Sequence, residues 1–347
     1  MAVPQTDSIE ATTLQLIRPR MTDNIFKANV IFAWFLMNGR IKTASGGKYI
    51  SEPLIYASNQ TVMAYRGYER LNVAPTEELT DAQYGYRLTA VTVGISGEEE
   101  LINNGENARF DLLRAKIKVA ELSIREFMNI KFLSPVSTKD ANRDIIGLDE
   151  IYDDTTAWST FGGINSNTYV FWRNILGTDG TGAAAGAPFT VTGTSAAPVV
   201  IPSTNFTDLP TLMNRMYHLC SKGGPDRPDL IVTTKDIYES YERAALDKLR
   251  LYDTNLAQLG FESIRFKDAY IVWDESVDLL KPAADTSPLY FINSDYMSFT
   301  LHTMRNFKMS AFISPWDQDA RVAQILFAGN STVANRRRLG VVYVRLT

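Results

Sequence analysis

Residues 108–133 of the chain read ARFDLLRAKIKVAELSIREFMNIKFL. Apolar residues recur in this stretch at spacings of three and four, which predicts an α-helix. The helix would span about 39 Å and end before Pro135, because the residue before a proline disfavours helical backbone angles. A second apolar stripe lies beside the first, so we expect a spine helix that is buried on more than one flank. The residues assigned to its core are Phe110, Leu113, Ile117, Ile124 and Phe127.

A shorter helix is predicted immediately before this spine. Ser96 and Glu99 have the spacing of a capping box, and the glutamates at 98–100 suit a helix N-terminus. The sequence Asn-Asn-Gly at 103–105 then interrupts the pattern. We therefore expect a short helix, a kink at Gly105 and then the long helix.

Between residues 40 and 95 the pattern changes to the alternation typical of β-strands. Strands are expected at 41–43, 49–57, 61–68 and 84–95, with a polar tip at 67–82. Together they predict one long β-hairpin that reaches away from the body of the protein. A two-stranded ribbon is marginally stable alone, so its apolar side chains need a surface supplied from elsewhere. We assign this contact with another subunit to Ile50, Leu54, Tyr56, Val62, Tyr65 and Tyr68.

The remaining segments predict a polar arm and a mixed α/β region. Residues 1–24 are polar with one short helix expected at 9–17, and 25–36 are apolar enough to need full burial. After the spine, strands and helices alternate, as in a mixed sheet with helical cover. Three β-rich runs at 298–313, 321–329 and 340–346 close the sheets. The Gly- and Ala-rich stretch 177–204 is interpreted as a surface loop or an inserted hairpin.

The composition argues against several classes of protein. The chain has 347 residues, of which 45% are hydrophobic and 21% charged, which is ordinary for a soluble protein with two sub-domains. A net charge of -4 gives no overall basis for gripping nucleic acid or a membrane surface. There is no signal pattern, and no apolar run is long enough to cross a bilayer. We expect a protein that is made in the cytosol and stays soluble there.

No pattern in the chain predicts catalysis or a metal site. Cys220, the single cysteine, lies two residues from His218, a spacing that does not let the two side chains meet on a helix. The stretch 180–185 matches a dinucleotide-binding pattern, but Pro188 blocks the helix that would hold the phosphates. The carboxylates Asp149, Glu150, Asp153 and Asp154 lack the spacing of a calcium loop, so we favour a solvated acidic face. We assign no catalytic residue, no cofactor and no metal ligand.

Arg336, Arg337 and Arg338 form the one dense basic cluster. It would either face the phosphates of DNA weakly or form a turn that pairs with neighbouring carboxylates, and we favour the turn. The chain also contains 17 Phe, 16 Tyr and 5 Trp residues, several in segments expected to be exposed. This aromatic content suits large protein–protein contacts.

The order of elements, together with short motifs along the chain, resembles one protein family. The motifs are TDNIF at 22–26, GRI at 39–41, GG at 46–47, EPLIY at 52–56, YRGYE at 65–69, GGIN at 162–165, FWR at 171–173, PDLIVTT at 228–234 and NRRRLG at 335–340. They resemble the major capsid (coat) protein of tailed bacteriophages, whose α+β fold is named after phage Hong Kong ninety-seven. The resemblance divides the chain into an N-terminal arm (1–39), an extended loop formed by the long β-hairpin (40–95), the spine helix of a peripheral domain (96–135), an axial α/β domain (136–300) and terminal strands of both domains (301–347).

This resemblance implies a structural protein of the virion. Copies would self-assemble in the host cytoplasm into the hexamers and pentamers of an icosahedral shell around double-stranded DNA, without a cofactor or a membrane. A separate scaffolding protein is implied because the extra N-terminal segment of some relatives is absent from the sequence. A portal and a decoration protein are further implied partners. In some relatives a lysine and an asparagine of neighbouring subunits form an isopeptide bond, but Lys42 and Lys48 lie near the base of the hairpin, so we expect non-covalent contacts alone.

Two other interpretations stay open at this point. An encapsulin-type shell around cargo enzymes would have the same fold, although the motifs resemble a different branch of it. An α/β enzyme with a dimerisation hairpin is the third alternative, and it lacks any recognisable catalytic motif.

Overall fold

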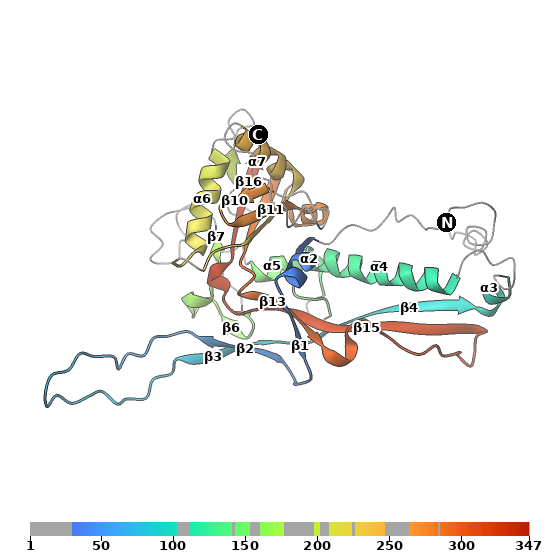
Figure 1. Ribbon diagram of the computed structural model, residues 1–347, viewed down its shortest axis with the longest axis horizontal. Helices are drawn as coiled ribbons and strands as arrows, with labels where there is room; N and C mark the ends of the chain where they lie inside the picture. Colours follow the sequence, from blue (N-terminus) through green and yellow to red (C-terminus); the bar gives the residue numbers. More distant parts are fainter. Residues whose placement is uncertain are drawn as a thin grey trace.

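The computed structural model describes residues 30–102, 112–140, 143–152, 160–176, 198–201, 208–223, 226–246, 264–283 and 285–346. The arm and helix expected before residue 30, the kink at Gly105, Phe110 and most of the Gly- and Ala-rich stretch lie outside these residues. Figure 1 shows a body with two long extensions. One extension carries a helix above two long strands, and the other is a hairpin that points in the opposite direction.

A seven-stranded sheet forms the centre of the upper body. Its spatial order is β10-β11-β9-β12-β16-β7, with β8 also paired to β16. Alternate residues of the central strands enter two different cores, so both faces of the sheet are covered. Helices α6 (Asp208–Cys220) and α7 (Lys235–Leu246) cover one face. The strands are β7 (Ile175–Leu176), β8 (Val199–Ile201), β9 (Leu230–Thr233), β10 (Ile264–Phe266), β11 (Ala269–Trp273), β12 (Thr286–Ile292) and β16 (Gly340–Leu346).

A five-stranded sheet runs from the body into the extension that carries the spine helix. Its longest strand pairs with β4 along a register from Ala320↔Ser96 to Gly329↔Arg87 and with β13 further along. The first strand of the sheet runs parallel to β13. The members are β1 (Ile41–Ala44), β4 (Arg87–Ser96), β13 (Met297–His302), β14 (Lys308–Met309) and β15 (Ala320–Val333). The three terminal β-rich runs therefore divide between the two sheets.

The expected single hairpin over 40–95 is wrong in its extent. Only β2 (Ile50–Ile55) and β3 (Leu79–Tyr84) form a two-stranded ribbon, in the register Ile50↔Tyr84 to Ile55↔Leu79. The outer strands β1 and β4 belong to the five-stranded sheet, where β13 and β15 supply their hydrogen bonds. The strand expected at 61–68 does not form, because no strand among the described residues lies beside that segment to share its hydrogen bonds.

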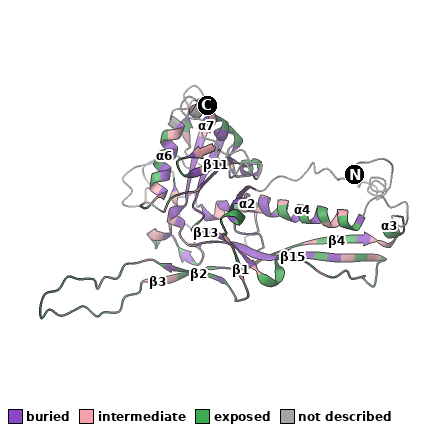
Figure 2. Ribbon diagram, viewed as in Figure 1, coloured by how far each residue is buried: buried purple, intermediate pink, exposed green. Residues whose placement is uncertain are grey.

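The spine helix is α4 (Leu112–Phe132), a long helix as the apolar spacing predicted, and it lies along β4. Its buried side is a narrow row at every fourth position, through Leu112, Ala120, Ile124, Met128 and Phe132. Leu113 and Phe127, assigned to the core from the sequence, are 36% and 43% exposed, and Ile117 is half-buried. The correction has a physical cause. Near Ala120 the helix packs on the ribbon of β4 and β15, and its last turns enter the main core, which leaves the flank that carries Leu113 and Phe127 exposed. Figure 2 shows the exposed residues that alternate along its outer side.

Short elements complete the junction between body and extensions. The capping box predicted at Ser96 is confirmed, because Ser96 N–H donates to Glu99 Oε2 at 3.1 Å and Glu99 N–H donates to Ser96 Oγ at 3.2 Å. Helix α2 (Val30–Met37) packs its Phe32 ring against those of Phe132 and Phe299. The full burial expected for this segment is wrong at its end, where Leu36 is 69% exposed. The other short elements are α3 (Gly97–Ile102), α5 (Leu148–Ile151), β5 (Thr160–Phe161), β6 (Ile164–Asn165) and the 3₁₀ turns η2 (Val136–Thr138), η3 (Val170–Trp172), η4 (Glu275–Leu280), η5 (Thr303–Arg305) and η6 (Arg336–Arg338).

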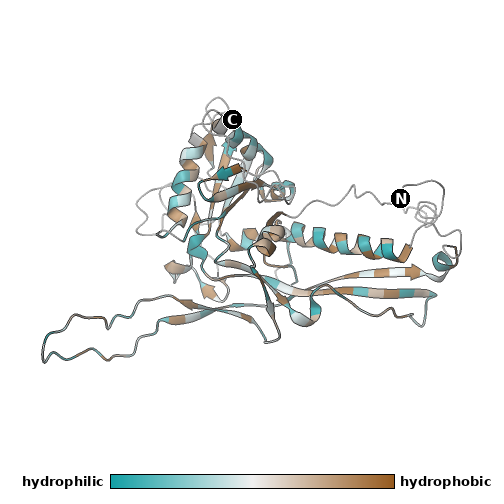
Figure 3. Ribbon diagram, in the orientation of Figure 1, coloured by the Kyte–Doolittle hydropathy of each residue, from teal (hydrophilic) through white to brown (hydrophobic). Residues whose placement is uncertain are grey.

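The distribution of apolar residues follows this architecture. In Figure 3 the apolar colour concentrates in the sheet of the upper body and along α2, while α4 carries polar residues between its apolar ones. Among the described residues, no helix has both the length and the hydropathy needed to cross a bilayer.

The Ile124→Asp substitution should lower the free energy of unfolding by several kcal/mol. Ile124 is 3% exposed, so an aspartate there would bury a carboxylate away from water, against a total stability of roughly 5–15 kcal/mol. Leu113→Asp is the matched control, because the same change on the exposed side of the same helix should cost less than about 0.5 kcal/mol. Thermal unfolding of the soluble fraction measures both, and equal losses would show that the buried row is assigned wrongly.

Candidate functional site

The residues first considered for chemistry have structural roles. Cys220 is fully buried, and burial raises the pKa of its thiol to about 12, which keeps the sulfur in its unreactive protonated form. Asp149 accepts a hydrogen bond from Val136 N–H at 2.7 Å, and Glu150 pairs with Lys139 at 3.2 Å. These two acids therefore hold a turn rather than form the solvated face that we expected, and Asp153 and Asp154 lie outside the described residues. In the described part of the chain, no three His, Cys, Asp or Glu side chains are grouped closely enough to hold a metal ion.

The base of the hairpin is the best-defined surface outside the two cores. Tyr84, the last residue of β3, is 1% exposed and donates its hydroxyl to the carbonyl of Val333 at 2.8 Å. Its ring packs edge-on against Phe161 at 5.6 Å, and burial raises the pKa of its hydroxyl. Gln83 N–H donates to the carbonyl of Gly162 at 2.9 Å. The hairpin therefore leaves the body from a fixed point on β15 and the β5–β6 turn.

The residues assigned to an inter-subunit contact divide into two groups. Ile50 and Leu54 are 6% and 8% exposed and belong to the main core of their own chain, so they are not available to a neighbour. This corrects the prediction, and the cause is that β2 lies against β15 instead of projecting freely. Tyr56, half-buried, stacks on Phe171 with ring centres 5.5 Å apart.

The other three residues lie on the exposed part of the hairpin beyond its paired strands. Val62, Tyr65 and Tyr68 are 85%, 64% and 107% exposed. Further exposed apolar side chains in the same segment are Met63, Leu71 and Val73. We call residues 57–78 the exposed tip, because nearly all of them are exposed (Figure 2). Large apolar side chains gathered on such a segment mark an interaction surface.

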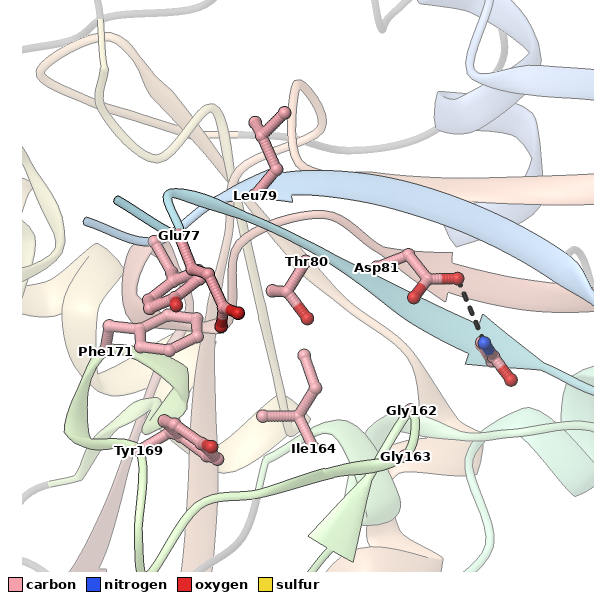
Figure 4. A pocket seen from close by; sticks show the side chains of 11 residues that line it. Glu77, Leu79, Thr80, Asp81, Gly162, Gly163, Ile164, Tyr169 and Phe171 are labelled. Atoms are coloured by element: carbon pink, nitrogen blue, oxygen red, sulfur yellow. Dashed lines mark hydrogen bonds between the residues drawn. The ribbon is translucent and has the colours of Figure 1, made fainter. Parts of the chain in front are cut away.

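A pocket of roughly 420 Å³ lies between β3 and the segment that carries the β5–β6 turn and η3 (Figure 4). In Figure 4 the rings of Tyr169 and Phe171 lie at one end of it with the Glu77 carboxylate beside Phe171, and Asp81 lies toward the other end. Tyr56 also lines the pocket. Hydrogen bonds from Gln83 and Ser51 hold the pKa of Asp81 below its usual value, so the carboxylate is charged at neutral pH. The pocket can accept an apolar or cationic side chain, and its lining offers no nucleophile paired with a base.

The basic cluster is not a surface turn that faces phosphates. Arg336 is fully buried and donates to the carbonyl of Ile151 at 2.9 Å and to Ser166 Oγ at 3.1 Å, with its guanidinium 4.7 Å from the centre of the Phe161 ring. Arg338 is 8% exposed, and Arg337 is half-buried. The DNA-facing alternative is therefore wrong for Arg336, because its side chain is fully buried. Neutral acceptors and an aromatic ring hold its charge at the junction of η6, α5 and β6.

Solved structures resemble this architecture along nearly the whole chain. The capsid asymmetric unit of cyanophage A-1(L) has 16% identity and a TM-score of 0.58, covering 94% of this chain and 96% of that one. The capsid structure of cyanophage P-SCSP1u has 11% identity and a TM-score of 0.54, covering 97% and 93%. The chain has the phage capsid fold. The SrpI encapsulin of Synechococcus elongatus shares it at 8% identity, with a TM-score of 0.52 and coverage of 99% and 96%.

These likenesses confirm the α+β capsid fold that the order of elements predicted. No sequence family and no curated protein matches the chain. Two features of the site were not predicted: the anchoring of Tyr84 on Val333 and the division of the arginine cluster. For the Tyr84 anchor, the one sequence signal is the alternation of side chains in 79–84 that is typical of a strand. The different positions of the three arginines depend on contacts between segments far apart in the chain.

Gly162→Ala should destabilise the base of the hairpin. Gly162 has φ of +60°, and an added Cβ would lie 3.1 Å from the Tyr84 hydroxyl and 3.2 Å from Ala82 Cβ. The strained backbone costs roughly 1–2 kcal/mol, and the close contact adds to it.

Gly163→Ala is the control for this prediction. Gly163 also has positive φ, +80°, but its added Cβ would meet no atom within 4 Å. Thermal unfolding should show a lower midpoint for Gly162→Ala than for Gly163→Ala. Equal midpoints would mean that the turn at Gly162 is not closely packed against Tyr84 and Ala82 of the hairpin.

Proposed function

We propose that the chain is a major capsid protein whose copies assemble into the hexamers and pentamers of an icosahedral shell around the double-stranded DNA of a tailed phage. The observation that carries the proposal is the exposed tip, because its apolar side chains are covered by nothing among the described residues of their own chain. The likeness to phage capsid structures supports it.

Physical arguments favour assembly through this hairpin. Apolar surface is stabilised by about 25 cal/mol for each Å² removed from water, so covering the tip on a second copy is favourable. The anchored base fixes the direction in which the tip leaves the body. Each contact in a shell is modest, but many simultaneous contacts make the assembly hard to reverse.

The proposed contact with DNA is weak and non-specific. The chain has a net charge of -4, and two of the three clustered arginines are buried. Because basic residues are not in excess over acidic ones, the affinity of the chain for duplex DNA should be low and should change little with salt. The scaffolding, portal and decoration partners implied by the family resemblance stay predictions.

A second candidate function is an encapsulin-type shell around cargo proteins. The likeness to the SrpI encapsulin supports it, although its TM-score of 0.52 is below that of the cyanophage capsid, 0.58. Extraction of nucleic acid from purified particles separates the two candidates. Double-stranded DNA of genome length supports the phage shell, and protein cargo without DNA supports the encapsulin.

Replacing residues 59–75 with a short Gly-Ser turn should abolish assembly without unfolding the chain. The deletion leaves the β2–β3 register and the Tyr84 anchor intact, and it removes the exposed apolar residues. Negative-stain images should show shells for the unaltered chain and none for the variant. The thermal midpoint should change by only a few degrees. Normal shells formed by the variant would refute the role of the tip.

Mature particles should run as a single band near 38.8 kDa on a denaturing gel. Lys42 pairs with Glu52 at 3.0 Å, and Asn330 is fully buried, donating to the carbonyl of Gly85 at 2.7 Å. Neither group is free to form an isopeptide bond with a neighbour. A ladder of higher oligomers after boiling would contradict this, and peptide mass spectrometry would name the linked residues.

A further inference from the structure

A second groove borders the opposite edge of the hairpin. The pocket of Figure 4 lies along β3, whereas this groove, of roughly 910 Å³, lies along residues 53–55 of β2. Tyr56 and Phe171 line both spaces, so the stacked pair separates them. We call the second space the basic groove, because Lys222, Arg337 and Arg338 line it and no carboxylate does.

The buried member of this set lacks an acceptor. Arg338 is 8% exposed, and its Nε is shielded from solvent without a hydrogen-bond partner among the described residues. A buried donor of this kind costs free energy until an acceptor reaches it. Asp226, a nearby carboxylate, hydrogen-bonds to the Tyr296 hydroxyl and does not line the groove. The cations that an incoming acceptor can reach are those of exposed Lys222 and half-buried Arg337.

The shape and lining of the basic groove indicate what kind of acceptor fits. Exposed Ile55 and half-buried Leu219 contribute apolar surface beside the cations. Duplex DNA is a wide, rigid cylinder whose phosphates are contacted by exposed cations, and it cannot reach an arginine buried in a groove. A carboxylate on a narrow polypeptide segment can enter, and arginine binds carboxylates through paired hydrogen bonds.

We propose that the basic groove receives an aspartate- or glutamate-bearing segment of a second copy of this chain. The inference rests on the proposed shell function. Rings of identical subunits form through two different surfaces that complement each other, so a basic surface on one copy needs an acidic one on the next. The chain has an excess of acidic residues, 39 against 35 basic ones. The groove also adjoins the hairpin that we assign to the contact between copies.

Zero-length cross-linking tests the occupant directly. Particles assembled from an equal mixture of ¹⁴N- and ¹⁵N-labelled chains are treated with a carbodiimide, which joins a lysine amine to a carboxylate in contact with it. We expect Lys222 peptides joined to Asp- or Glu-containing peptides of this protein, with both isotopes in one product. Lys222→Arg keeps the charge and should remove that product. Links confined to a single isotope, or no link at Lys222, would overturn the proposal.

Charge removal tests the contribution of the groove without altering buried Arg338. The double substitution Lys222→Gln with Arg337→Gln should raise the protein concentration needed for half-maximal assembly about tenfold. The matched control is Arg305→Gln with Lys308→Gln, which removes two exposed cations that do not line the groove. Equal assembly of the two variants would overturn the inference and leave the proposed function standing. Unaltered chains that form no particles would overturn both.

Discussion

The backbone hydrogen bonds of β15 connect the parts of this molecule that would otherwise separate. One end of the strand pairs with β4 beneath the spine helix, and the other pairs with β13. Its final residue, Val333, accepts the hydroxyl of Tyr84 and so fixes the hairpin. The burial of β15 increases along its length. The strand is partly exposed near Ala320 and is buried from Phe327 onward. Both extensions therefore depend on the core that encloses this end of β15.

The sequence predicted those elements whose hydrogen-bond partners belong to the same short segment of the chain. A helix makes its own hydrogen bonds, so the three-and-four spacing of 112–132 was enough to place α4, and the capping box placed α3. Which side of α4 is buried depends instead on its contacts with β4 and β15, which are separate elements of the chain. The spacing within the helix could not show these contacts, so Leu113 and Phe127 were wrongly assigned to the core. The predicted hairpin was too long for the same reason, because alternation of apolar and polar residues predicts a strand but does not show which strand pairs with it.

The arginine cluster shows the limit most clearly. Three consecutive basic residues indicate exposed charge by composition alone, yet a 3₁₀ turn points successive side chains in different directions. Arg336 consequently enters the core, where Ser166 and the Ile151 carbonyl accept its hydrogen bonds, while Arg337 and Arg338 line a groove. These acceptors lie 170 and 185 residues away in sequence, so no local pattern reveals them.

The long register between β4 and β15 has a mechanical consequence. A pull on the hairpin is transmitted through Tyr84 to the strand that follows it and acts along the axis of β4. Strands that slide past each other load all their cross-strand hydrogen bonds together, whereas strands that peel apart break them one at a time. The register from Ser96 to Arg87 would therefore bear tension in shear.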